Sequence, residues 1–268
     1  MSFVAGIDIG SRTTKAVILD EARRILGTAA VRTRPDFPGV AREALAHALA
    51  EAGLQEGDLT YTATTGFGRY NVPSRDIQIT DITSGARGAS FVFPGTTCVL
   101  DIGCQSTRAI RVRDGGKVKE FRTNDKCAAG SGGFIERAGR YLEVGLEEIG
   151  GLSLQADSPQ SISSVCAVLA ESEIINHLTA GVSVENILRG IHVSLANRAL
   201  ALLKRVGLAP ELTVIGGVAR QAGMVKALEE TLGMAVNVPS QPELVGAVGA
   251  ALLGLGRAEK RGLAKAAA

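Results

Sequence analysis

The chain has 268 residues, of which 46% are hydrophobic, enough to fill the cores of one large or two small domains. Its 29 basic and 27 acidic residues leave a formal net charge of +2, and aromatic residues make up only 4% with no tryptophan, which argues against nucleic-acid and anionic-lipid partners. The longest apolar run, 244–256, is too short and glycine-rich to cross a bilayer, and no basic segment precedes an apolar one at the N-terminus, so we expect a cytoplasmic protein without membrane contact.

A thirteen-residue pattern occurs twice, first as DIGSRTTKAVILD at 8–20 and again as DIGCQSTRAIRVR at 101–113. In each copy an Asp-Ile-Gly ends an apolar run, polar residues follow, and a second apolar strand begins, which predicts a β-hairpin with polar groups at its tip. Asp and Gly are also common in plain tight turns, but a plain turn has no reason to recur with its strands matched. The repeat therefore predicts two phosphate-binding turns that together grip a polyphosphate.

The first turn contains the groups that a phosphate needs. The glycine lets backbone N–H groups approach an anion, the hydroxyls donate hydrogen bonds, and a carboxylate can hold a magnesium-bound water. For Lys15, a solvated strand lysine is an equally good interpretation. We expect Asp8 to be catalytic and phosphate contacts to come from Gly10, Ser11, Arg12, Thr13, Thr14 and Lys15.

After this hairpin, helices and strands alternate in the first half. Small and apolar residues at helical spacing predict a helix over 39–52, and Gly53 stands where such a helix ends. Asp81 and Thr83 are possible caps of a further helix. The other expected elements of this half are a strand at 59–65, a glycine loop at 66–69 and the segment 77–89.

The second half repeats the alternation. Its expected elements are a strand at 98–102, a glycine loop and helix over 130–142, helices at 165–178 and 184–206, a strand at 212–215, a helix at 224–232, a strand at 235–238 and a frayed tail from Arg257. This order predicts an α/β fold with two related lobes, 1–95 and 96–268.

Several segments carry a family resemblance. The two hairpins and VIGGVARQAGMVKALEETLG at 214–233 resemble the nucleotide-binding motifs of the superfamily that contains actin, hexokinase and the heat-shock chaperones. The segments NDKCAAGSGGFIERAGRYL at 124–142 and SSVCAVLAESEIINHL at 163–178 look like the branch of ATP-dependent reductive activators. That branch serves 2-hydroxyacyl-CoA dehydratases, and the ATPase subunits of benzoyl-CoA reductase are close relatives. The resemblance covers nearly the whole chain.

The resemblance implies roles in nucleotide binding. Gly216 and Gly217 match a turn that packs against adenosine without an intervening side chain. In the family the second phosphate turn commonly reads Asp-Ile-Gly-Gly-Gln-Asp, whereas Ser106 stands here at the last position and provides no carboxylate. This difference argues against fast hydrolysis, although Gln105 can still orient water. The implied catalytic residues here are Asp101 and Gln105, and the implied nucleotide-binding residues are Gly103, Cys104, Gln105, Ser106, Gly130, Ser131, Gly132, Gly216, Gly217 and Val218.

The four cysteines, at 98, 104, 127 and 166, contain no Cys-x-x-Cys pair, so their spacing suggests no metal site within one chain. From the residues alone, Cys127 is best interpreted as a small buried hydrophobe. The resemblance implies instead that Cys127 and Cys166 are two ligands per protomer and that a homodimer completes one 4Fe-4S cluster. Each lies at or just before an expected helix start, where the helix dipole stabilises a thiolate. We expect Cys98 in the core and Cys104 as a tolerated small residue.

The resulting hypothesis is an ATP-hydrolysing electron donor that binds ATP or ADP with Mg²⁺ and drives electrons from its 4Fe-4S cluster into an acyl-CoA dehydratase or aryl-CoA reductase component. The glycine loop 130–133 is the expected lever between nucleotide and cluster. A small-molecule kinase of the same superfamily is one rival, and it predicts no iron. A nucleotide-binding regulator without hydrolysis is another, which fits Ser106 but leaves Cys127 and Cys166 unexplained.

Overall fold

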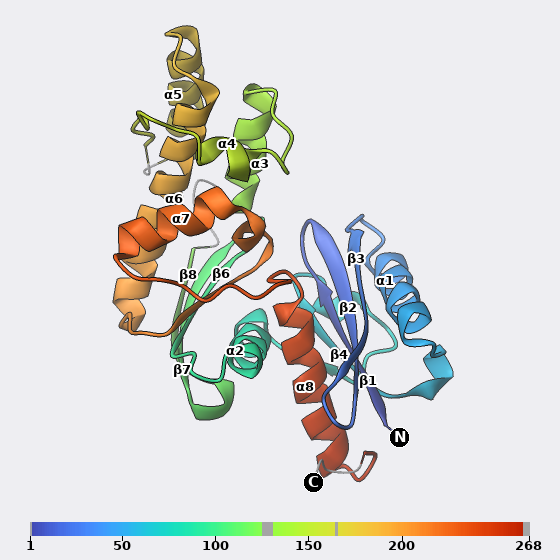
Figure 1. Ribbon diagram of the computed structural model, residues 1–268. Coiled ribbons are helices and arrows are strands. Elements are labelled where there is room, and N and C mark those ends of the chain that lie inside the picture. Colours follow the sequence, from blue (N-terminus) through green and yellow to red (C-terminus); the bar gives the residue numbers. More distant parts are fainter. Residues whose placement is uncertain (1, 125–130, 164–165, 265–268) are drawn as a thin grey trace. The chain divides into compact units, whose positions relative to one another are not determined.

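The computed structural model describes residues 2–124, 131–163 and 166–264, and contacts divide the chain into two compact units (Figure 1). The first unit comprises Met1–Pro94, Arg113–Val118 and Leu244–Ala268, and the second comprises Gly95–Val112 and Lys119–Glu243. The sequence pattern groups 96–268 in one lobe, whereas the chain from Leu244 onward packs within the first unit.

The first unit is built on a five-stranded sheet in the order β3-β2-β1-β4-β5. Strands β1, β2 and β3 form an antiparallel meander, β4 pairs parallel to β1, and β5 pairs parallel to β4. The predicted first hairpin is therefore present, with a third strand that was not expected from the sequence. The bounds are Phe3–Ile9 for β1, Thr13–Asp20 for β2, Ile25–Arg32 for β3, Leu59–Gly66 for β4 and Ile77–Gln78 for β5.

Helices cover both faces of this sheet because successive strand residues point to opposite sides. Helix α1 (Phe37–Ala52) packs on the side of Ile7 and Ile18. It begins after Asp36, whose carboxylate accepts a hydrogen bond from the Gly39 N–H at 3.0 Å, and it ends at Gly53 as predicted. Helix α8 (Val245–Lys260) packs on the opposite side, against Val17 and Leu19. Figure 1 shows α1 and α8 on either side of the strands.

Helix α2 (Asp81–Val92) packs closely against α8. Its cap is Thr80, whose side chain accepts a hydrogen bond from the Thr83 N–H, so the prediction of Asp81 or Thr83 as the cap is wrong. A Cβ on Gly249 would overlap the carbonyl oxygen of Ser84. A glycine is therefore required at this position for the backbones of α2 and α8 to approach each other.

The second unit contains a four-stranded sheet in the order β8-β7-β6-β9. The predicted second hairpin is the antiparallel pair β6–β7, and β9 runs parallel to β6. The strand bounds are Cys98–Ile102 for β6, Thr107–Arg113 for β7, Lys117–Asn124 for β8 and Leu212–Ile215 for β9. The helix bounds are Gly132–Tyr141 for α3, Ile149–Ser153 for α4, Ala167–Thr179 for α5, Val184–Val206 for α6 and Ala222–Leu232 for α7.

The core of the second unit forms around the long helix α6. Its residues Ile187 and Ile191 are fully buried in the same cluster as Leu100 of β6 and Val214 of β9. Apolar residues of α3, α5 and α7 belong to this cluster as well. The strand ends that carry the second Asp-Ile-Gly turn are therefore supported by a close-packed core.

Two expected elements differ from the structure. The strand predicted at 235–238 is a single bridge between Thr213 and Asn237, because the chain soon reaches Pro239, which has no N–H to extend a ladder. The tail predicted to fray from Arg257 continues α8 to Lys260, since Ala258 is buried against Tyr61. Among the residues that the structure describes, no helix combines the length and the apolar character needed to cross a bilayer.

Candidate functional site

The first Asp-Ile-Gly turn joins β1 to β2. Asp8 stands opposite Lys15 in the strand register, and the Lys15 Nζ lies 3.1 Å from Asp8 Oδ2. The Gly10 N–H donates to the carbonyl oxygen of Thr13 at 3.2 Å, which closes the turn. The turn thus presents a carboxylate and an ammonium group side by side, which are the two charges that a metal-bound phosphate can use.

The hydroxyl groups of this turn face different ways. Thr14 is fully buried, and its hydroxyl lies 2.9 Å from the hydroxyl of Thr33. Thr33 in turn donates to the carbonyl oxygen of Gly10 at 2.8 Å. Thr14 therefore supports the turn from inside, whereas solvent reaches the other predicted contacts at the tip, which are Ser11, Arg12 and Thr13.

Two glycines of the first unit lie against Asp8. Gly66 ends β4 with a φ of +87°, and a Cβ at this position would overlap Asp8 Oδ1. A Cβ on Gly246 of α8 would lie 3.5 Å from Asp8 Oδ2. Because Gly66 has both a positive φ and no room for a side chain, the backbone closes directly on the carboxylate.

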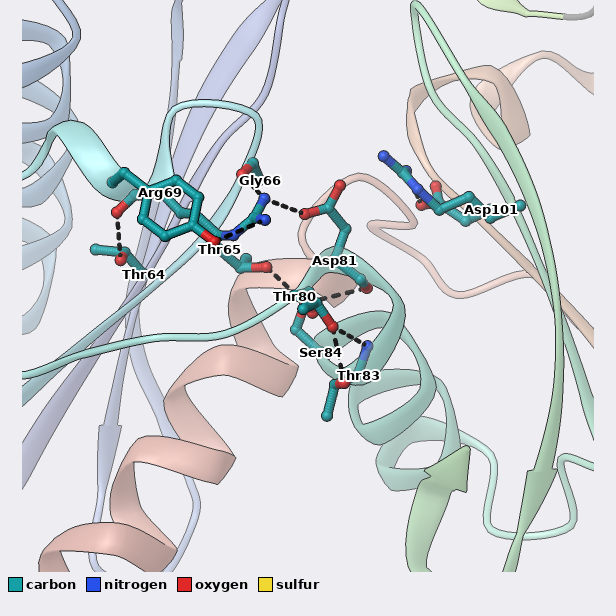
Figure 2. Close-up of polar contacts among 11 residues, drawn as sticks. Thr64, Thr65, Gly66, Arg69, Thr80, Asp81, Thr83, Ser84 and Asp101 are labelled. Atoms are coloured by element: carbon teal, nitrogen blue, oxygen red, sulfur yellow. Dashed lines mark hydrogen bonds and ion pairs between the residues drawn. The ribbon is translucent and has the colours of Figure 1, made fainter. Parts of the chain in front are cut away.

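Polar side chains tie the end of β4 to helix α2, as Figure 2 shows. Arg69 donates from Nη1 to the carbonyl oxygen of Gly66 at 2.9 Å, and the same nitrogen lies 3.4 Å from Asp81 Oδ1. The hydroxyls of Thr65 and Ser84 are 2.8 Å apart. This network was not expected from the sequence, in which the Gly-Phe-Gly-Arg loop is its only visible sign.

The second turn reproduces the first in detail. Asp101 stands opposite Arg108 in register, and Arg108 Nη1 lies 2.8 Å from Asp101 Oδ2. The Gly103 N–H donates to the carbonyl oxygen of Ser106 at 2.9 Å, the same closure as in the first turn. Arg108 was not among the predicted residues, although aligning the two repeats places it at the position of Lys15. Both turns therefore carry an aspartate paired with a cation.

The repeat extends to the strand beside each turn. Gly216 follows β9 with a φ of +90°, and a Cβ on it would lie 2.7 Å from Asp101 Oδ1. Gly66 stands in the corresponding relation to Asp8 in the first unit. A Cβ on Gly217, by contrast, would meet no atom within 4 Å. Gly217 thus borders open space, while the next residue, Val218, is buried.

The second turn rests on the start of helix α3. The Gly132 N–H donates to the Gly103 carbonyl at 2.9 Å, and the Gly133 N–H donates to the Cys104 carbonyl at 2.7 Å. A Cβ on Gly132 would lie 2.6 Å from Val218 Cγ2. The second turn, the start of α3 and the glycine turn at 216–218, all predicted to bind nucleotide, are therefore in contact within the second unit. Of their neighbours, Ser131 is buried at the helix start, Gln105 is exposed, and Gly130 lies outside the described residues.

A buried histidine supports the segment after Gly217. His192 Nδ1 lies 2.8 Å from Ser153 Oγ, and Nε2 lies 3.0 Å from Gln221 Oε1. Burial lowers the pKa of His192 to about 4, so the ring is neutral at pH 7. Gln221 is the residue before α7, and the histidine thereby holds the end of the glycine turn in place.

One predicted cluster ligand lies in the described part of the chain. Cys166 is the residue before the first turn of α5 and is half-buried, while Cys127 lies outside the described residues. A thiol at a helix N-terminus fits the donor that an anionic iron–sulfur cluster requires. Cys98 is fully buried in β6, as predicted, and Cys104 is half-buried in the second turn. Within the described ranges, no three His, Cys, Asp or Glu side chains form a metal-binding group.

Comparison with known proteins gives consistent matches over almost the full length. The BadF/BadG/BcrA/BcrD ATPase family model matches residues 5–254. The activator of lactoyl-CoA dehydratase from Anaerotignum propionicum is 42% identical over 97% of this chain and 100% of its own. One of the subunits of benzoyl-CoA reductase from Thauera aromatica is 41% identical over 97% of this chain and 95% of its own.

Solved structures agree with these matches. The activator of the 2-hydroxyisocaproyl-CoA dehydratase from Clostridium difficile, with bound ADPNP, has a TM-score of 0.92 and 35% identity over 97% of both chains. A ROK family glucokinase from Streptomyces griseus has a TM-score of 0.58 and 18% identity over 94% of this chain and 99% of its own, which shows the fold alone. The predicted α/β fold of the actin and hexokinase type is confirmed.

Proposed function

Because the chain belongs to the BadF/BadG/BcrA/BcrD ATPase family, we propose that it is an ATP-hydrolysing electron donor for an acyl-CoA dehydratase or an aryl-CoA reductase component. The relatives named as a dehydratase activator and as part of a benzoyl-CoA reductase support both kinds of partner. The observation that carries the proposal is the pair of matched turns, each with an aspartate beside a cation.

The two turns bind the phosphates of ATP or ADP and their Mg²⁺. Asp8 and Asp101 hold magnesium-bound water, because a carboxylate is the ligand that this ion prefers. Lys15 contributes a positive charge to a phosphate oxygen, and Ser11, Arg12 and Thr13 contribute donors at the exposed tip. In the second turn Cys104, Gln105 and Ser106 contribute the corresponding donors, while Gly103, whose N–H closes the turn, lets the phosphate approach the backbone.

Adenosine lies against Gly216, Gly217 and Val218. The open space in front of Gly217 supports this assignment, because a base or ribose can approach its backbone without meeting a side chain. Gly130, Ser131 and Gly132 complete the nucleotide site next to the second turn. Gln105 orients the attacking water, and the absence of a carboxylate at Ser106 makes hydrolysis slow compared with relatives that have one.

One 4Fe-4S cluster is held between two copies of the chain by Cys127 and Cys166 of each. When bound, such a cluster supplies reversible transfer of one electron at low potential. The first turn of α5 stabilises negative charge at Cys166 through its N–H groups. Next to this cysteine, Val168 and Leu169 are 68% and 54% exposed, and Ile175 and Leu178 of the same helix are exposed as well, so α5 presents apolar side chains to solvent. A homodimer covers this surface and completes the four thiolates.

The cluster is tested by iron content after anaerobic purification. We expect about four irons per dimer in the wild type, the stoichiometry of a cubane held by four thiolates. Cys127→Ala and Cys166→Ala should lose the iron and its visible absorbance, whereas Cys98→Ala is the matched control and should keep both. Full iron content in both ligand variants would contradict the assignment.

A further inference from the structure

We propose that the ion pair between Arg137 and Glu171 transmits the nucleotide state from the second phosphate turn to the first turn of α5. The inference rests on the proposed function. Arg137 and Glu171 act as positioning residues that connect the nucleotide site to the cluster site. Its physical basis is a continuous chain of contacts within the second unit, from Gly103 to Cys166.

The first link joins the phosphate turn to α3. The first N–H groups of a helix have no partner within the helix. In α3, two of them, from Gly132 and Gly133, donate to the carbonyl oxygens of Gly103 and Cys104 at 2.9 and 2.7 Å. A Cβ on Gly133 would lie 2.9 Å from the Cys104 carbonyl oxygen, so the turn and the start of α3 are packed backbone against backbone. A shift of this turn must move α3 or break both hydrogen bonds.

The second link joins α3 to α5. The Arg137 Nε donates to Glu171 Oε1 at 2.7 Å, and the Tyr141 hydroxyl lies 3.3 Å from Glu171 Oε2. Both oxygens of one carboxylate on α5 are therefore held from α3. We call these contacts of Glu171 with Arg137 and Tyr141 the clamp. Glu171 stands five residues after Cys166, so the clamp holds the same short stretch of helix that begins at the cysteine.

The buried apolar contact between α3 and α5 and the Arg137–Glu171 ion pair have different effects on the two helices. Phe134 of α3 and Ile174 of α5 are fully buried in the common core, which resists separation of the helices. Apolar contacts are non-directional, however, and permit sliding, whereas an arginine–carboxylate bond fixes one orientation. The ion pair is partly exposed, with side-chain exposures of 37% and 20%, so its contribution to folding is small and its contribution to orientation is separable.

The test is hydrogen–deuterium exchange of the full-length protein, saturated with Mg²⁺ and either ADP or the non-hydrolysable analogue ADPNP. In the wild type, amides in peptides covering 166–179 should exchange at rates that differ by about threefold or more between the two nucleotides. Arg137→Gln and Glu171→Gln should each remove this difference, while calorimetry shows nucleotide affinities within about twofold of the wild type. The exchanged pair Arg137→Glu with Glu171→Arg should restore it.

The matched control is Arg140→Gln. Arg140 also lies on α3 but pairs within that helix with Glu136 at 2.8 Å, so its removal deletes the same charge without cutting the link to α5. This variant should keep the nucleotide-dependent difference. Retention of the difference in both clamp variants, or its absence in a wild type that binds both nucleotides, overturns the inference. Absence of nucleotide binding in the wild type instead refutes the proposed function.

Discussion

Gly216→Ala is the substitution whose cost follows most directly from the structure. Gly216 has a φ of 90° and a ψ of 167°, a region that is nearly restricted to glycine and costs other residues about 1–3 kcal/mol. An added Cβ would lie 2.5 Å from the Ile102 carbonyl oxygen and 2.7 Å from Asp101 Oδ1. The end of β6 or the carboxylate must move, so we expect the free energy of unfolding to fall by about 3 kcal/mol.

The adjacent residue is the control for this substitution. A Cβ on Gly217 would meet no atom within 4 Å, so Gly217→Ala should change the free energy of unfolding by less than about 0.5 kcal/mol. Urea denaturation measures both variants, with the loss read from the midpoint at an unchanged slope. A Gly216→Ala variant as stable as the wild type, or equal losses at both positions, would refute the reasoning.

Three further predictions concern the nucleotide turns and the buried histidine. Asp8→Asn should abolish ATPase activity while the circular dichroism spectrum stays unchanged, and substantial residual hydrolysis would exclude Asp8 from catalysis. Gly217→Val should weaken ADPNP binding by about tenfold or more in calorimetry through steric exclusion of adenosine, with wild-type affinity counting against the assigned adenosine contact. Because His192 binds its proton at a pKa of about 4 in the folded state and about 6.5 when unfolded, the unfolded chain takes up more protons as the pH falls between these values, and stability decreases. From pH 7 to pH 5 this group alone should lower the free energy of unfolding by about 2 kcal/mol. Urea denaturation at each pH should show that His192→Gln removes this loss, and an unchanged pH dependence of stability in that variant would disprove the role of His192.

The repeat made the central part of the fold predictable. A hairpin forms from neighbouring residues, so the apolar strands and the Asp-Ile-Gly turn are sufficient to predict it. Equal spacing in both copies also places Lys15 and Arg108 opposite their aspartates, although only the lysine was considered from sequence. Local sequence patterns are thus sufficient to predict both hairpins and the cation opposite each aspartate.

Contacts between distant segments were not predictable in the same way. Nothing local in the Gly-Phe-Gly-Arg loop indicates that Gly66 closes on Asp8, because that contact depends on the parallel pairing of β4 with β1. The hydrogen bond of the buried Thr14 hydroxyl depends on Thr33, which directly follows β3, a strand that was not expected. Likewise, the chain after Leu244 joins the first unit because α8 packs on β2. The apolar pattern of this helix predicts that one face is buried but does not indicate which sheet covers it.

The most direct test of the central claim is whether ATP gates electron transfer. The anaerobically reduced protein is mixed in a stopped-flow instrument with purified dehydratase or reductase components of the kinds that its relatives serve, and oxidation is followed by the loss of reduced-cluster absorbance. We predict transfer at least about tenfold faster with MgATP than with MgADP, a difference of about 1.4 kcal/mol in the barrier, and no sustained turnover with ADPNP. Equal rates with all three nucleotides would contradict the account, because the nucleotide would then have no part in driving the electron.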